Sequence, residues 1–114
     1  MASYAKRLLS NSTNGKAIAI GTGSTEIHTA VGTSNDFDEI WIYVVNNSTS
    51  ILKLQLFWGG TTDPDNVIQQ DVMSQAGLFL VAPGILLNGG LTLYGKTTAS
   101  HSLYVYGFVN RINA

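Results

Sequence analysis

The sequence predicts a single all-β domain, an antiparallel two-sheet β-sandwich of about eight strands. Three observations support this fold class. Apolar residues at i, i+3, i+4 and i+7 are not sustained anywhere, so no segment predicts a helix. Val, Ile, Thr, Tyr and Phe dominate the ordered-looking segments. Short apolar or alternating runs recur roughly every 8 to 15 residues, separated by clusters of turn-forming residues. Periodicity leaves two sandwich types open, a jelly roll and an immunoglobulin-like fold.

The expected strands follow from these runs. We expect a polar connection at 46–50 to form a hairpin, and Pro83-Gly84 to interrupt the strand around it. The sandwich domain is predicted to span 16–114, and 1–15 to form an extended N-terminal arm with Leu8 and Leu9 as its anchors. The expected strands are 16–20, 25–31, 39–45, 51–58, 67–73, 78–81, 85–87 together with 91–94, and 103–109.

The chain carries few charges. Its 114 residues include six basic and seven acidic residues, or 11% charged, where about 25% is usual. With a net charge of −1, little electrostatic repulsion keeps copies apart. The surface must therefore be rich in small polar residues or be partly covered by other subunits. This composition favours a protein that assembles into a homo-oligomer.

Other partner classes are disfavoured by the sequence. The basic residues are scattered, which argues against direct nucleic-acid binding. The longest apolar stretch, 77–87, is interrupted by Pro83-Gly84 and is too short to span a membrane. Residues 1–15 contain no long apolar segment of the kind that a secretory signal needs. The absence of cysteine excludes disulfides and fits folding in a reducing cytoplasm.

No constellation of residues predicts catalysis. His28 and His101 are expected to be surface or interface residues, because no signature brings a nucleophile and an orienting group to either. Gly21-Thr22-Gly23 lacks the third glycine and the following helix of a dinucleotide site, so it predicts a turn. We therefore expect no enzyme activity and no cofactor.

The run Asp63-Pro64-Asp65-Asn66 is the one segment that could offer oxygen ligands to Ca²⁺. It lacks the regular ligand register and the distal Glu of a calcium-binding loop. The same residue types are favoured in β-turns for their own reasons, and a turn is the preferred interpretation. No metal site is predicted.

Aromatic residues lie on the second faces of two strands whose first faces are already aliphatic. A sandwich strand normally has one apolar face and one polar face, so large rings on the other face are typical of buried interfaces. The alternative is that a loop or the N-terminal arm covers them. The predicted assembly contacts are Leu8, Leu9, Trp41, Tyr43, Tyr104, Tyr106 and Phe108.

Several stretches, spread over most of the chain, are similar to a family of small virion proteins of tailed bacteriophages, the capsid decoration or cement proteins. They are Lys6-Arg7-Leu8-Leu9-Ser10, Ser12-Thr13-Asn14-Gly15, Ile27-His28-Thr29-Ala30, Phe37-Asp38-Glu39, 58–66 from Trp58 to Asn66, Pro83-Gly84, Leu87-Asn88, and Gly107-Phe108-Val109-Asn110-Arg111-Ile112.

The resemblance implies a β-sandwich that oligomerises, commonly as a trimer, at junctions between capsomers. It would bind the major capsid protein on the capsid surface of the virion and reinforce the shell, after synthesis in the cytoplasm of the bacterial host. The alternative function is a glycan- or receptor-binding module of a phage tail or fibre, with Trp58 beside Asp63, Asp65 and Asn66 as the binding loop.

Overall fold

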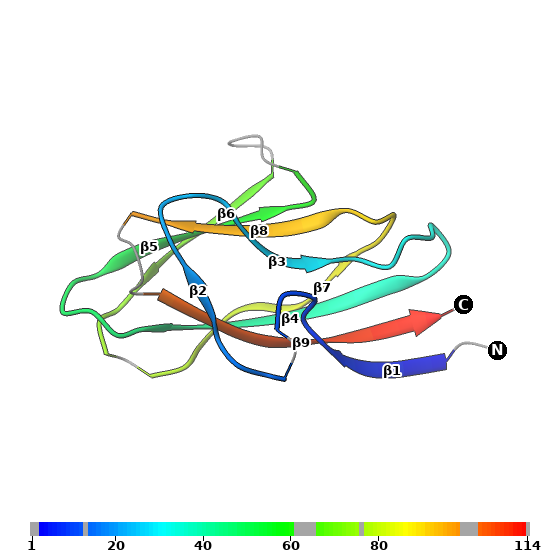
Figure 1. Cartoon of the computed structure of the whole chain (residues 1–114), viewed down its shortest axis with the longest axis horizontal. Coiled ribbons are helices and arrows are strands. Elements are labelled where there is room, and N and C mark those ends of the chain that lie inside the picture. Colours follow the sequence, from blue (N-terminus) through cyan, green and yellow to red (C-terminus); the bar gives the residue numbers. More distant parts are fainter. Residues whose placement is uncertain (1–2, 13, 61–65, 76, 99–102, 114) are drawn as a thin grey trace.

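A computed structural model describes residues 3–12, 14–60, 66–75, 77–98 and 103–113. The described residues form two antiparallel β-sheets packed face to face and no helix (Figure 1). The predicted two-sheet sandwich is therefore confirmed, with nine strands rather than about eight. The strands are β1 (Ser3–Leu8), β2 (Ile18–Ile20), β3 (Thr25–Thr29), β4 (Phe37–Asn46), β5 (Leu52–Trp58), β6 (Val67–Val72), β7 (Phe79–Leu87), β8 (Thr92–Thr97) and β9 (Leu103–Asn113).

The strand pairing is that of a jelly roll. Strands β2 to β9 pair first with last and inward from there: β2 with β9, β3 with β8, β4 with β7, and β5 with β6. This is the pattern of one long hairpin rolled into two sheets. The five-stranded sheet has the order β1-β9-β4-β7, with β2 also on β9, and the four-stranded sheet has the order β3-β8-β5-β6.

The ninth strand comes from the segment that was expected to be an arm. β1 is extended and pairs with β9 over six residues, from Ser3 opposite Asn113 to Leu8 opposite Phe108. β2 pairs with the other end of β9, so that the two short strands follow one another along its edge. The described ends of the chain therefore lie at the same end of the molecule (Figure 1).

Two expectations about the ends and connections of strands were wrong. Residues 46–50 do not close a hairpin, because β4 and β5 belong to different sheets and this segment crosses between them. The buried Asn46 side chain holds the crossing by donating to the carbonyl oxygens of Ser50 and Val72. β7 runs through Pro83-Gly84, where register shifts mark irregular pairing. Proline is tolerated there because β7 is an edge strand and one side of it needs no donor.

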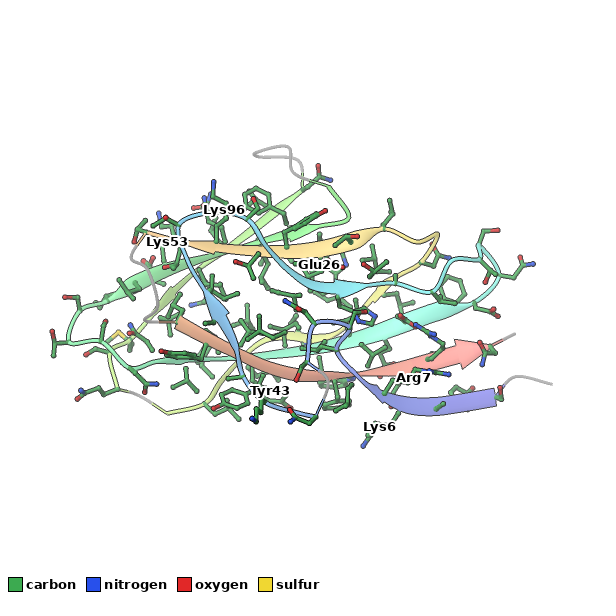
Figure 2. The ribbon with its side chains drawn as sticks, viewed as in Figure 1. Lys6, Arg7, Glu26, Tyr43, Lys53 and Lys96 are labelled. Carbon is green, nitrogen blue, oxygen red and sulfur yellow. The ribbon has the colours of Figure 1, made fainter. Side chains whose placement is uncertain are left out.

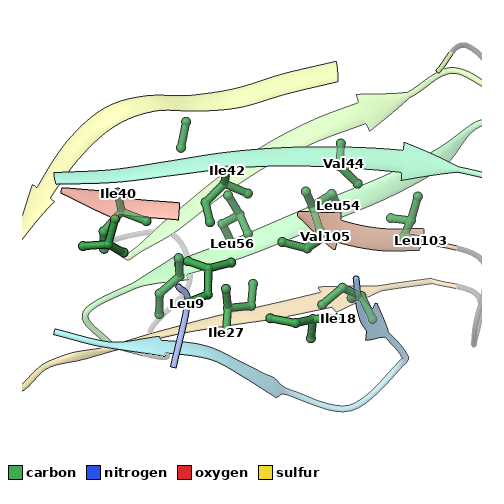
Figure 3. Packing of buried hydrophobic residues seen from close by; sticks show 14 of the residues in the cluster. Leu9, Ile18, Ile27, Ile40, Ile42, Val44, Leu54, Leu56, Leu103 and Val105 are labelled. Atoms are coloured by element: carbon green, nitrogen blue, oxygen red, sulfur yellow. The ribbon is translucent and has the colours of Figure 1, made fainter. Parts of the chain in front are cut away.

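The core fills the space between the sheets. Alternate residues of β4 and β5 point inward from opposite sheets and meet aliphatic side chains from β9, β2 and β3 (Figure 3). Its fully buried large side chains are Leu9, Ile20, Ile27, Ile40, Ile42, Leu54, Leu56, Leu93, Leu103, His28, Val44 and Val105.

Leu9 belongs to this core, although the sequence predicted an assembly contact at that position. Only 2% of its side chain is exposed, whereas the neighbouring Leu8 is 47% exposed. The chain leaves the sheet edge after β1 and turns inward, and Leu9 packs against the backbone at Gly107. Leu9 cannot contribute contact area to a partner unless the sandwich opens.

The two adjacent leucines provide a matched test of this arrangement. Leu9→Ala should lower the free energy of unfolding by about 2 to 5 kcal/mol, because it leaves a cavity between the sheets. Leu8→Ala removes a half-exposed side chain and should cost less than about 1 kcal/mol. Urea denaturation of both variants measures the difference, and equal losses would contradict the placement of Leu9.

Candidate assembly interface

The outer face of the five-stranded sheet gathers the aromatic residues that the sequence singled out. In antiparallel sheets, residues paired across strands share a face. Trp41 pairs with Phe108 and Tyr43 pairs with Tyr106, and the inward positions between them are Gly107 on β9 and the buried Ile42 on β4. The same register adds Tyr4 and Leu8 from β1, Phe37 from β4, Ile112 from β9, and Leu80, Pro83 and Leu86 from β7.

The two outer faces of the sandwich differ in charge. Among the described residues that the register places outward on the five-stranded sheet, only Lys6 and Glu39 are charged. The outward positions of the four-stranded sheet carry Glu26, Lys53, Asp71 and Lys96 within a smaller set of residues. Figure 2 shows Lys6 and Tyr43 below the five-stranded sheet, and Lys53 and Lys96 beside the other sheet. The outer face of the four-stranded sheet is therefore suited to contact with water, whereas the outer face of the five-stranded sheet is largely apolar.

Several large apolar side chains on this outer face are open to solvent. Tyr4 is 74% exposed, Leu86 49%, and Tyr106 40%. A contiguous apolar surface on a monomer is typical of an interaction site rather than of an ordinary protein surface. We name this surface the aromatic face; it consists of Tyr4, Leu8, Phe37, Trp41, Tyr43, Leu80, Leu86, Tyr104, Tyr106, Phe108 and Ile112, with Lys6, Asn110 and Glu39 among them.

The centre of the aromatic face is well packed. The rings of Trp41 and Phe108 stack with centroids 5.9 Å apart and planes 9° from parallel. Lys6 places its Nζ atom 4.9 Å from the centroid of the Phe108 ring, within the range of a cation–π contact. The ring of Trp41 also extends over Gly84, where a side chain would meet it at 3.0 Å. These contacts hold the rings in fixed positions, which lowers the entropy cost of binding a partner.

Glu39 is the acidic residue of the aromatic face. Its carboxylate accepts hydrogen bonds from the Trp41 indole N–H at 2.9 Å and from the Asn110 amide at 3.1 Å. These two bonds favour the ionised carboxylate and hold the pKa of Glu39 below its ordinary value, against the smaller effect of burial. The face therefore carries a fixed negative charge beside its aromatic centre.

Six of the seven predicted contact residues lie together on the outer face of the five-stranded sheet. Trp41, Tyr43, Tyr104 and Phe108 are half-buried, and Tyr106 and Leu8 are exposed, all on the aromatic face. β1 lies beside β9 in the plane of the sheet, so this part of the expected arm does not cover the rings. Phe37, Leu80, Leu86, Lys6 and Glu39 could not be placed on this face from the sequence, because their positions depend on the strand register.

A buried polar cluster links the two sheets near one end of the sandwich. The Asp38 carboxylate, fully buried on β4, accepts two hydrogen bonds from Arg111 on β9, at 2.7 and 3.0 Å. It also accepts one at 2.7 Å from Nε2 of His28 on β3. The Val31 backbone N–H donates to the same carboxylate at 3.1 Å. No buried polar side-chain atom of this cluster lacks a hydrogen-bond partner, as a buried polar group requires.

His28 was expected at the surface or in an interface but is only 2% exposed. The β3–β8 register shifts between Glu26 and His28, so strict alternation fails there. Ile27 and His28 are consequently both buried. Arg111 and Asp38, which complete the cluster, are far apart in the sequence, and only the pairing of β4 with β9 brings them opposite each other.

Ser10, His28 and Asp38 have the residue types of a nucleophile, a base and an orienting acid, and the Ser10 hydroxyl oxygen lies 2.9 Å from Nδ1 of His28. The Ser10 backbone N–H donates to the same nitrogen at 3.0 Å, so the lone pair that a base would use is shared between the hydroxyl and the backbone. The Ser10 hydroxyl accepts from the Thr29 N–H at 3.0 Å. We interpret the cluster as a structural link between the sheets and the segment that follows β1.

The cluster predicts acid sensitivity. Burial alone raises the pKa of Asp38, but hydrogen bonds from Arg111 and His28, with their charges, outweigh burial and hold the pKa below its ordinary value of 3.8. A lowered pKa contributes stability above the unfolded value, and this contribution is lost as the pH falls through the folded pKa. The free energy of unfolding should therefore fall on acidification below about pH 4.

The Asp38→Asn variant isolates this contribution from that of other carboxylates, including Glu39, whose lowered pKa acts in the same direction. Chemical denaturation at a series of pH values should give a shallower acid slope for Asp38→Asn than for the native chain. An identical slope for the two proteins would contradict the assignment.

Two candidate positions from the sequence, His101 and the 63–65 part of the Asp63–Asn66 run, lie outside the described residues. Within the described part, no group of three or more metal-ligating side chains and no pocket is found. The Trp58 indole N–H donates to the Leu86 carbonyl oxygen at 3.3 Å, and its ring packs against the core. No helix among the described residues has the length and hydropathy to cross a membrane.

Comparisons with known proteins identify no family. No protein-family model and no curated protein matches the chain. Among solved structures, it is similar to a chain from Bacillus endospore appendages, described as a novel family of disulfide-linked pili. The two are 14% identical with a TM-score of 0.44, over 97% of this chain and 85% of that chain. A likeness this distant carries no argument about function.

Proposed function

We propose that this protein is a structural virion protein, a capsid decoration protein that stabilises a phage head by bridging capsid subunits. The observation that carries the proposal is the aromatic face: a largely apolar sheet surface, with exposed Tyr4, Leu86 and Tyr106, on a molecule whose opposite face is charged. Such a surface is stabilised when neighbouring subunits exclude water from it.

The stabilisation of the shell would be the sum of many small contact free energies. Burying a side chain such as Tyr106 or Leu86 contributes roughly 25 cal/mol for each Å² of apolar surface removed from water. One such contact is modest, but a symmetric shell repeats it at every equivalent position, and a copy bound to two neighbours resists their separation. A rigid sandwich with preformed aromatic contacts suits this role, because little order has to be gained on binding.

The particular partner, the major capsid protein, is proposed from the sequence resemblance, and the sparse charge of the chain supports assembly in general. An apolar contact would persist at high salt, unlike one built on surface ion pairs. Attachment to the capsid is therefore expected to be insensitive to ionic strength.

The proposal is tested with capsids of the phage that encodes the chain, purified without this protein. The native protein should bind them saturably and should raise the temperature at which they release DNA. Leu86→Glu places a charge at an exposed position of the aromatic face and should weaken binding at least about tenfold, which corresponds to about 1.4 kcal/mol. Gln69→Glu, which adds the same negative charge on the exposed side of β6, is the control and should bind as the native protein does. Failure of the native protein to bind such capsids would overturn the proposal.

A further inference from the structure

The aromatic face is built from cross-strand rows that are symmetric about β9. Three rows run from β1 across β9 to β4, and each joins residues that are paired in the register. They are Tyr4–Ile112–Phe37, Lys6–Asn110–Glu39 and Leu8–Phe108–Trp41. Apolar side chains flank β9 on both sides in two of the rows. In the third row, a positive charge lies on one side of β9 and a negative charge on the other.

From this pattern we propose that the aromatic face binds the same face of a second copy of this chain, about a two-fold axis that runs along β9, which gives a dimer in place of the trimer that the resemblance implies. The inference rests on the proposed role as an assembly subunit and names the neighbour that covers this face. A rotation of 180° about that axis exchanges the positions of β1 and β4. Lys6 of each copy then lies opposite Glu39 of the other, and no charge meets a like charge.

The apolar rows are self-complementary under the same rotation. Tyr4 of one copy meets Phe37 of the other, Leu8 meets Trp41, and each Phe108 lies near its own symmetry mate. Face-to-face sheets pack about 10 Å apart, which is the distance that such large side chains fill. A two-fold interface requires this kind of self-complementarity, because the same residues contribute on both sides.

The overlapping area is sufficient for a specific contact. The face has three rows of strand about 4.8 Å apart: β4 with ten residues, β9 with eleven, and the edge on which β1 and β2 follow one another with six and three. At about 3.3 Å per residue they give a flat footprint of roughly 480 Å² on each copy. Both copies together therefore bury roughly 950 Å² before side-chain relief is counted, close to the approximately 1,000 Å² of a specific interface. β7 has no counterpart under this axis, so Leu80 and Leu86 remain outside the pair, where they are free to contact another protein.

The test is a charge exchange, followed by sedimentation velocity and light scattering of the purified full chain. The native protein should be a dimer at about 100 µM. Lys6→Glu and Glu39→Lys each place like charges opposite one another twice per dimer, so each should raise the dissociation constant at least about tenfold. The double variant, Lys6→Glu with Glu39→Lys, restores both pairs and should return the constant to within about threefold of the native value.

Lys96→Glu, a charge reversal on the other sheet, is the control and should leave the dimer unchanged. Circular dichroism and thermal unfolding confirm that each variant is folded, and Lys6→Gln and Glu39→Gln replace any variant that is not. Double-variant rescue supports the pairing, because the contacts of Lys6 with Phe108 and of Glu39 with Trp41 within one copy are not restored by the exchange.

A native protein that is a monomer or a trimer, or a double variant as weak as the singles, would overturn the two-fold pair. These outcomes are distinct from failure of the proposed function, which is read from capsid binding. A monomer that binds capsids would support the decoration role and contradict the dimer. A dimer that does not bind capsids would support the dimer and contradict the decoration role.

Discussion

Replacing Asp38 with alanine should lower the free energy of unfolding by about 3 to 5 kcal/mol, a large share of the stability of a domain this size. The loss in stability arises because the groups that donate hydrogen bonds to this carboxylate are left without an acceptor. Nε2 of His28, the Arg111 guanidinium and the Val31 backbone N–H all lose their shared acceptor. Arg111 is partly exposed and can turn toward water, but His28 is buried and cannot.

Urea denaturation followed by fluorescence measures this loss, with Asp71→Ala as the control. Asp71 is an exposed carboxylate on β6, and its removal should change the free energy of unfolding by less than about 0.5 kcal/mol. A loss below about 1 kcal/mol for Asp38→Ala would contradict the cluster as a link between the sheets.

Gly107→Ala should destabilise the sandwich by about 3 kcal/mol or more, or prevent folding. Gly107 lies opposite Ile42 in the central pair of the five-stranded sheet. A methyl group there would overlap the carbonyl oxygen of Trp41 and would lie 3.3 Å from a methyl group of Leu9. Because the first obstacle is backbone, no change of rotamer relieves it, and β4 must move away from β9.

Gly23→Ala is the matched control for this substitution. A side chain at Gly23 meets no atom within 4 Å, and its backbone does not adopt a positive φ. Its effect on the free energy of unfolding should be within about 0.5 kcal/mol. Equal thermal stability of the two alanine variants would show that β4 and β9 are not packed as described.

The sandwich could be predicted from the sequence because its strands alternate cleanly. β5 alternates Leu52, Leu54 and Leu56 with more polar residues, and the inward set is the buried one. β4 and β9 carry aliphatic residues on one face and rings on the other, so the aromatic surface was also visible in the sequence. Local periodicity contains this information because a strand has a period of two.

What could not be predicted depends on long-range pairing or on irregular backbone. Leu8 and Leu9 are adjacent residues of the same type, so the sequence does not distinguish them. The turn of the chain after β1 decides which of them is buried. His28 is buried because the register of β3 with β8 shifts, and the residue pattern of this segment does not predict that shift. The pairing of Lys6, Asn110 and Glu39 in one row joins three strands that are distant in the sequence.

The central claim is that this chain assembles through the outer face of its five-stranded sheet. Hydroxyl-radical footprinting of the free and the assembled protein tests it directly, because tyrosines lie on both outer faces. Tyr43 and Tyr106 on the aromatic face should become protected on assembly, whereas Tyr94 on the four-stranded sheet should keep its reactivity. Protection of Tyr94 with unchanged Tyr43 and Tyr106 would contradict the account.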